Sequence, residues 1–215
     1  LIWYLENVFY KSFGTIYDYI QQNIFDGKQI DNDIINIGFW PGGDRDGNPF
    51  VTPKITLNVA KRLHDTVIKN YYRDVRRLKR KLTFVGVEER INVLEKELYK
   101  IITNKNSNLT AESFASELEV NKNVITKEHQ SLYVSEVNSL LNKIHLFGFH
   151  FANLDIRQDS RKHNQFFNDM VNALIENGST IFPKNYHDLS EKEQIKILSK
   201  VEGEIDLGII KDDET

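Results

Sequence analysis

Two charged motifs contain the residue types that could do chemistry in this sequence. The first is GGDRDGNP at residues 42–49, where Arg45 stands between Asp44 and Asp46 in a glycine-rich turn. Glycine lets a backbone adopt positive φ and approach a ligand closely, and a planar guanidinium binds phosphate or carboxylate with paired hydrogen bonds. The pattern indicates either an anion-binding loop or a surface turn with an internal Asp–Arg ion pair, and it favours neither.

The second motif is LDIRQDSRKH at residues 154–163. On a β-strand, Asp155, Arg157 and Asp159 would all point to one side of the sheet. Charged side chains at strand ends are what a β/α barrel uses at its catalytic rim. The alternative is a strand–helix junction whose charges cap the following helix, and the residues by themselves slightly favour this alternative.

Other kinds of site have little support in the sequence. The chain has no cysteine, which excludes disulfides, thiolate metal sites and a cysteine nucleophile. Its six histidines lack the spacing of metal ligands, so we interpret them as core or surface residues. The sequence also lacks a GxSxG motif and the Gly-Lys-Ser/Thr of a P-loop.

Residues 73–81 form a basic run that includes Arg73, Arg76, Arg77, Lys79, Arg80 and Lys81. Such a run could bind nucleic acid. The whole chain, however, has a net charge of −3, and acidic residues follow at 88–97. We therefore interpret the run as the solvent-facing side of a helix and expect no nucleic-acid partner.

The composition indicates a soluble intracellular protein, and we expect it to be cytoplasmic with no membrane partner. Of its 215 residues, 40% are hydrophobic, which is enough for a substantial core. No apolar run approaches the roughly 18 residues that a membrane-spanning helix needs, and the first residues lack the basic region of a signal peptide.

The apolar spacing predicts a mainly α fold with two short β-strands, at 34–40 and 149–157, each ending in an Arg-containing motif. The predicted helices are 1–25, 53–82, 88–102, 111–118, 124–147, 161–177 and one that begins after the capping box at Ser190. On the first helix the residues expected to face inward are Ile2, Leu5, Phe9, Phe13, Ile16 and Ile20. On the helix at 161–177 they are Phe166, Met170, Leu174 and Ile175.

Taken together, these motifs resemble phosphoenolpyruvate carboxylase. GFWPGGDRDGNPFVTP is similar to the family signature GSWMGGDRDGNPxVTP, and GFHFANLDIRQDSRKH is similar to FGxxLxxLDIRQESxxH. IWYLENVFY and YHDLSEKEQIKIL resemble the segments before the first signature and after the second, so the resemblance covers almost the whole chain. Among the departures from the pattern, Pro41 replaces Met and Asp159 replaces Glu.

The resemblance implies that residues 1–215 are a single internal fragment of an α-rich (β/α) TIM-type barrel. The parent enzyme would join bicarbonate to phosphoenolpyruvate, giving oxaloacetate and phosphate, with Mg²⁺ or Mn²⁺. The family's catalytic histidine lies in a TAHPTE-like stretch, and its metal carboxylates, catalytic lysine and FHGRGG loop lie further along. None of these motifs occurs here, so we expect no catalytic residue and no metal ligand in the fragment, and an inactive chain.

Residue roles follow from the same resemblance. Arg157 matches the family's arginine that contacts the phosphate of phosphoenolpyruvate, and Arg45 is a second, weaker candidate for substrate binding. The aspartates expected to organise the site are Asp44, Asp46, Asp155 and Asp159.

The resemblance also implies a homo-oligomer, a tetramer in the family. The fragment itself should self-associate or rearrange into a helix-dominated fold, because its strands and apolar faces would lack partners. The alternative function is a non-catalytic helical domain that binds a phosphoanion or another protein.

Overall fold

The structure is a computed structural model that describes residues 1–28, 35–46, 48–203 and 208. It divides into two compact units, one of residues 1–44 and 48–156 and the other of residues 45–47 and 157–215. The boundary between the units therefore falls inside both charged motifs, after Asp44 and after Ile156.

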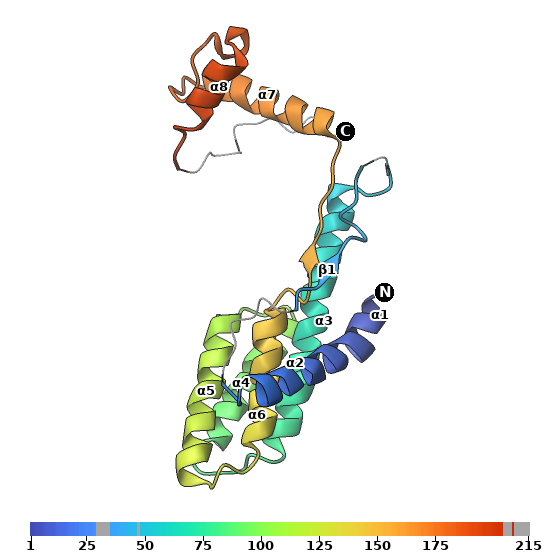
Figure 1. Ribbon diagram of the computed structural model, residues 1–215, viewed down its shortest axis with the longest axis vertical. Coiled ribbons are helices and arrows are strands. Elements are labelled where there is room, and N and C mark those ends of the chain that lie inside the picture. Colours follow the sequence, from blue (N-terminus) through green and yellow to red (C-terminus); the bar gives the residue numbers. More distant parts are fainter. Residues whose placement is uncertain (29–34, 47, 204–207, 209–215) are drawn as a thin grey trace. The chain divides into compact units, whose positions relative to one another are not determined.

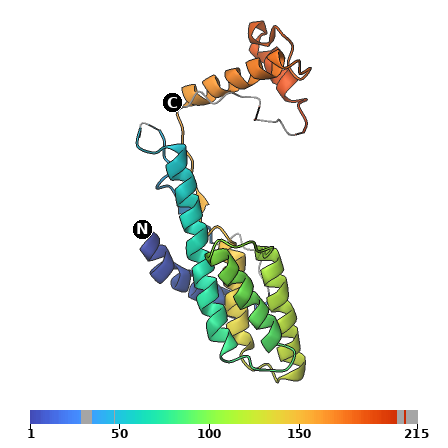
Figure 2. The same ribbon diagram turned by 180° about the vertical axis from the view of Figure 1, so that it is seen from behind.

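The first unit consists mainly of helices. In chain order its elements are α1 (Ile2–Tyr4), a π-helical turn (Leu5–Phe9), α2 (Tyr10–Ile24), β1 (Gly38–Phe39), α3 (Pro53–Lys79), α4 (Glu88–Ile102), α5 (Ala111–Glu128), α6 (Val134–Phe147) and β2 (Asn153–Leu154). Helices α3, α4, α5 and α6 lie alongside one another as a bundle, and α2 crosses the bundle (Figures 1 and 2). The prediction of a mainly α fold with two short strands is confirmed.

The bundle has a continuous apolar core. Each helix contributes side chains that are almost fully buried, among them Leu63, Val67, Tyr71, Val75, Ile91, Leu94, Leu98, Phe114, Leu118, Ile125, Val137 and Leu141. The central Tyr71 is satisfied at its polar end, because its hydroxyl donates to the carbonyl oxygens of Lys143 (3.1 Å) and Gly148 (2.7 Å). A buried tyrosine without such acceptors would be costly.

Local capping chemistry explains where several helices begin. The Thr52 hydroxyl accepts a hydrogen bond from the Ile55 amide at 3.4 Å, and Pro53 occupies the first position of α3. In the second unit, the Glu193 carboxylate accepts hydrogen bonds from the Ser190 amide (3.0 Å) and hydroxyl (2.6 Å). Both predicted starts are confirmed.

Most of the basic residues at 73–81 are matched by acids within the first unit. Arg73 pairs with Glu6 from the π-helical turn, Arg76 and Lys79 pair with Glu95 of α4, Arg77 pairs with Asp74, and Lys81 pairs with Glu136 of α6. These contacts agree with the interpretation of residues 73–81 as an ordinary helix face.

The break between α5 and α6 was predicted at the wrong place. Helix α5 runs through residues 119–123 to Glu128, and Asn121 and Ile125 within it are buried. The chain turns instead at residues 129–133, where Gln130, Ser131 and Tyr133 have positive φ.

The inward face of the first helix was predicted correctly only in part, since Leu5 is buried and Ile2 and Phe13 pack against the core. Phe9 and Ile16 are 40% and 46% exposed, whereas Tyr10 and Tyr17 are buried. The π-helical turn at Leu5–Phe9 explains the difference, because its extra residue rotates the following helix by about one position. The core face therefore moves from Phe9 and Ile16 to the next residue in each case.

The two strands are shorter than predicted and pair in parallel. Instead of 34–40 and 149–157, they comprise only Gly38–Phe39 and Asn153–Leu154. Gly38 pairs with Asn153 and Phe39 with Leu154. Ile34, the predicted first residue of the first strand, lies outside the described residues.

The second unit packs around α7 (Ser160–Glu176), with a 3₁₀ turn (Tyr186–Asp188) and α8 (Glu191–Leu198). Its core consists of Val171, Leu174, Phe182 and Tyr186, with Phe167, Met170 and Ile175 among the residues packed against it. Phe166, predicted to face inward, is 51% exposed, and its neighbour Phe167 contacts the rings of Phe182 and Tyr186 instead.

Within the described ranges, no helix combines the length and the apolar character that crossing a bilayer requires.

Candidate functional site

The parallel strand pair brings the two charged motifs to the same edge. The Asn153 amide donates to the Ile37 carbonyl oxygen at 2.8 Å, and the Asp155 amide donates to the Phe39 carbonyl oxygen at 2.9 Å. Because paired parallel strands end on the same side, the segments after Phe39 and after Leu154 leave together. Sites in β/α proteins are built at this carboxyl edge.

The first two glycines of GGDRDGNP are required by packing within the protein. Gly42 has φ of +85°, and a Cβ there would lie 2.6 Å from the Val59 side chain. A Cβ on Gly43 would overlap the carbonyl oxygen of Asp155. Gly43 therefore allows the first motif to lie directly against the backbone of the second. From the sequence, this glycine was interpreted as a place where a ligand could approach; the structure gives it a role in packing within the protein.

The turn of the first motif is closed by main-chain hydrogen bonds. The amides of Gly43 and Asp44 both donate to the Trp40 carbonyl oxygen, at 3.0 and 3.2 Å. The Thr56 hydroxyl of α3 donates to the Gly42 carbonyl oxygen at 2.7 Å. These contacts anchor the turn to the first helix of the bundle and hold Asp44 at the end of the first unit.

Arg45 and Asp46 belong to the second unit. The Arg45 amide donates to the Arg157 carbonyl oxygen at 2.9 Å, so main-chain pairing between the motifs continues there. The Arg45 side chain is half-buried, and none of the ion pairs among the described residues includes it. The internal Asp–Arg ion pair considered for this turn is therefore not formed with Asp44 or Asp46.

Asp155 and Arg157 are both exposed. Strand β2 ends at Leu154, so neither residue continues a strand, and Asp159 lies at the start of a helix. The prediction that all three project from one side of a sheet is wrong, because regular strand geometry stops before the first of them.

Asp159 caps α7. Its Oδ1 accepts a hydrogen bond from the Arg161 amide at 2.8 Å, and its two carboxylate oxygens accept from the Arg161 guanidinium at 2.5–3.1 Å. These side-chain bonds, together with the backbone bond, lower the pKa of Asp159 to about 2. The sequence offered two interpretations of Asp159, and the structure agrees with the one in which its charge caps the following helix.

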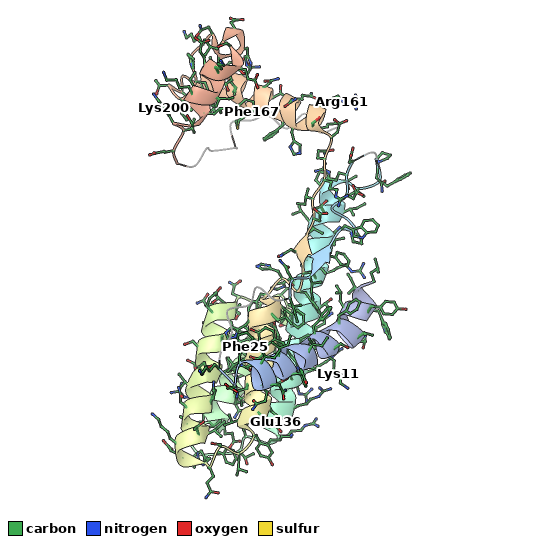
Figure 3. The ribbon with its side chains drawn as sticks, in the orientation of Figure 1. Lys11, Phe25, Glu136, Arg161, Phe167 and Lys200 are labelled. Atoms are coloured by element: carbon green, nitrogen blue, oxygen red, sulfur yellow. The ribbon has the colours of Figure 1, made fainter. Side chains whose placement is uncertain are left out.

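Arg161 is the residue that the sequence reasoning missed. Its pKa is raised by the hydrogen bonds and charge of Asp159, and Asp46 of the first motif contributes a smaller part of the same effect. The sequence did hold a signal for the cap itself, since Asp is among the preferred N-cap residues. Arg161 is labelled in Figure 3 at the beginning of α7.

Chemically, the second unit offers one arginine, Arg161, that is held by a carboxylate, Asp159. The protein does not offer a metal site in the part of the chain that the structure describes, because no three His, Asp or Glu side chains gather there.

Comparison with known proteins gives a consistent answer. The family model described as phosphoenolpyruvate carboxylase matches residues 2–108 and 87–207. A phosphoenolpyruvate carboxylase of Prochlorococcus marinus subsp. pastoris is 25% identical over 248 residues, covering 87% of this chain and 24% of the relative.

Two further relatives carry the same name. That of Nitrosomonas eutropha is 25% identical over 241 residues, covering 91% of this chain and 25% of the relative. That of Shewanella loihica is 30% identical over 180 residues, covering 69% of this chain and 20% of the relative. The chain thus spans about a quarter of the length of the curated relatives it matches.

Proposed function

The chain belongs to the phosphoenolpyruvate carboxylase family, and from that premise we propose that it is part of an enzyme that carboxylates phosphoenolpyruvate. The reaction joins bicarbonate to phosphoenolpyruvate and releases oxaloacetate and inorganic phosphate. The observation that carries the proposal is the parallel pairing of β1 and β2. Because of this pairing, the segments that contain the two family motifs begin at the same edge of the strand pair. We further propose that this pair forms two neighbouring strands of a β/α barrel in the whole protein, located in the cytoplasm.

In this proposal Arg157 binds the phosphate group of the substrate. Its side chain is exposed, and its backbone is joined to Arg45 by a 2.9 Å hydrogen bond. A guanidinium suits this role because it presents parallel donors to two phosphate oxygens and stays charged at all relevant pH values. Arg45 would add a second positive charge, with a smaller effect on substrate binding.

The four aspartates organise the site in different ways. Asp159 already has a defined task, since it fixes the first turn of α7 through Arg161. Asp155 meets the first motif at Gly43 through its backbone. Asp44 and Asp46 would set the path of the loop on either side of Arg45.

A divalent metal, Mg²⁺ or Mn²⁺, would supply charge stabilisation for the reacting oxygen atoms. The described residues do not fit such an ion, because they hold no cluster of His, Asp and Glu. We therefore propose that its ligands lie outside this chain, that the chain alone is inactive, and that the complete enzyme is a homo-oligomer such as a tetramer.

The test replaces Arg157 with lysine in the full-length protein that contains this chain. A point charge cannot reproduce the paired donors of a guanidinium, so kcat/KM for phosphoenolpyruvate should fall by about 10²-fold or more, the effect of losing one key donor in an active site. Arg90→Lys on α4 is the matched control, because Arg90 lies away from both motifs and pairs with Glu117 on the neighbouring helix. Unchanged kinetics in Arg157→Lys would remove this residue from the site.

A further inference from the structure

Away from both motifs, the first unit contains two adjoining hollows along α3, each of about 380 Å³. One hollow lies toward α2, and the other lies between the C-terminal end of α3 and the first half of α6. The two hollows share Asp74, Arg77, Ser139 and Lys143. We call the two together the α3 groove. Figure 3 labels Lys11, which lines only the first hollow, and Glu136, which lines only the second.

The carboxylate at the centre of the groove is already neutralised. Asp74 accepts hydrogen bonds from the Tyr10 hydroxyl (2.8 Å), the Lys143 ammonium (2.8 Å) and the Arg77 guanidinium (3.3 Å). Burial and the neighbouring Asp74 charge raise the pKa of Tyr10 well above its ordinary value, so this hydroxyl remains a donor. Asp74 therefore repels an incoming anion only weakly.

The remaining charges make both hollows positive. Each is lined by four cationic side chains and two acidic ones, in a chain whose overall charge is −3. Lys11 and Arg80 take part in none of the ion pairs within the described residues. The Arg77 side chain is 76% exposed and donates to Asp74 at 3.3 Å, so its guanidinium has further N–H groups that can donate to an anion.

A buried amide also lines one of the two hollows. Asn70, which lines the hollow toward α2, is 4% exposed. Its Oδ1 accepts a hydrogen bond from Arg73 at 3.4 Å, but its Nδ2 donates to no atom of the described residues. Leaving such a donor unsatisfied is costly, and buried polar groups in proteins nearly always have an acceptor.

Part of the lining of the same hollow comes from an irregular piece of helix. Glu6 and Asn7 lie in the π-helical turn, and Glu6 pairs with Arg73 at 2.6 Å. Single π-helical turns are frequent at binding sites, because they re-aim side chains at modest cost. Here the turn delivers polar side chains to a hollow that already has an excess of positive charge.

We propose that the α3 groove binds a small polyanion, a molecule with at least two phosphate or carboxylate groups, one held in each hollow. Arg77 and Lys143 bridge the two groups, with Lys11 at one end and Arg80 at the other. The apolar side chains of Leu78 and Leu140, which line the second hollow, contact the non-ionic part of the ligand. This binding site is separate from the two motifs and does not depend on the proposed catalytic function.

Calorimetric titration of the full chain at constant ionic strength tests the proposal, with pyrophosphate and succinate as probes. Arg77→Gln and Arg80→Gln should each weaken binding of the preferred probe about tenfold or more, equivalent to about 1.4 kcal/mol. The matched control is Arg76→Gln. Arg76 directly precedes Arg77 on the same helix, but its guanidinium contacts Glu95 and the ring of Tyr72, outside the groove. The control should bind as the unaltered chain does.

Two further results decide the site and the ligand class. Binding should persist in Arg157→Gln; if it is lost there and kept in Arg77→Gln, the anion belongs to the motifs and the groove proposal is overturned. Equal weakening in Arg76→Gln and Arg77→Gln, or absence of binding of both probes, also overturns it. Preference for pyrophosphate identifies a phosphate ligand, and preference for succinate a dicarboxylate.

Discussion

Within the first unit, the α3–α6 bundle and the segments that carry the motifs differ in how their apolar side chains are used. In the bundle, Leu98 and Phe114 are completely buried, whereas beside the first motif Trp40 and Phe50 are 62% and 82% exposed. The bundle is held by its own side-chain packing. The motif segments are held by main-chain hydrogen bonds and by a glycine contact.

This difference separates a scaffold from the parts it presents. Helix α3 links the two, because its middle is buried in the bundle while Thr56 near its start bonds the Gly42 carbonyl oxygen. A disturbance in the bundle should therefore reach the motifs, whereas a disturbance in the motifs should leave the bundle folded.

The largest expected effect comes from the bundle core. Leu98→Ala removes a side chain that is 0% exposed and should destabilise the chain by about 2–5 kcal/mol, the usual cost of such a cavity. Denaturant unfolding followed by far-UV circular dichroism measures this loss. Leu57→Ala is the control, because Leu57 on α3 is 71% exposed; similar losses in the two variants would contradict the assignment of the core.

A smaller and local effect is expected at the strand pair. Gly43→Ala would press a methyl group into the Asp155 carbonyl and should cost about 1–3 kcal/mol, as overpacking usually does. Hydrogen exchange should become faster at the amides of Asn153 and Asp155, which bond across the pair, and stay slow in α4. Gly38→Ala is the matched control, because a Cβ there would meet no atom of the described residues within 4 Å.

The helices were largely predictable because their signals are local. Thr52-Pro53 marks the start of α3, and the apolar spacing of residues 88–102 gives α4 with its observed bounds. The turn between α5 and α6 was not predictable in this way, since residues 119–133 contain neither glycine nor proline. Non-glycine residues adopt positive φ there, so no local sequence pattern predicts the turn.

The family was predictable from the sequence, but the geometry of the candidate site was not. The motifs identified the family from the sequence, and comparison confirmed it. The role of Gly43 depends on the Asp155 backbone, more than a hundred positions away, so only the strand pairing reveals it. The capping role of Asp159, by contrast, is local, and the sequence had offered it as an alternative.

The smallest effect on stability is expected at Asp159. It tests whether the contact between Asp159 and Arg161 stabilises the start of α7 in solution. Because Arg161 lowers the pKa of Asp159 from 3.8 to about 2, the ionised cap stabilises α7 above about pH 4, and this contribution is lost as the pH falls toward 2. Carboxyl-carbon NMR should give a titration midpoint near 2 that rises toward 3.8 in Arg161→Gln. Asp159→Asn keeps a capping acceptor without the charge, so in that variant the start of α7 should lose its pH dependence while α3–α6 remain unchanged. A midpoint already near 3.8 in the unaltered chain would mean that the Arg161 contact does not form in solution.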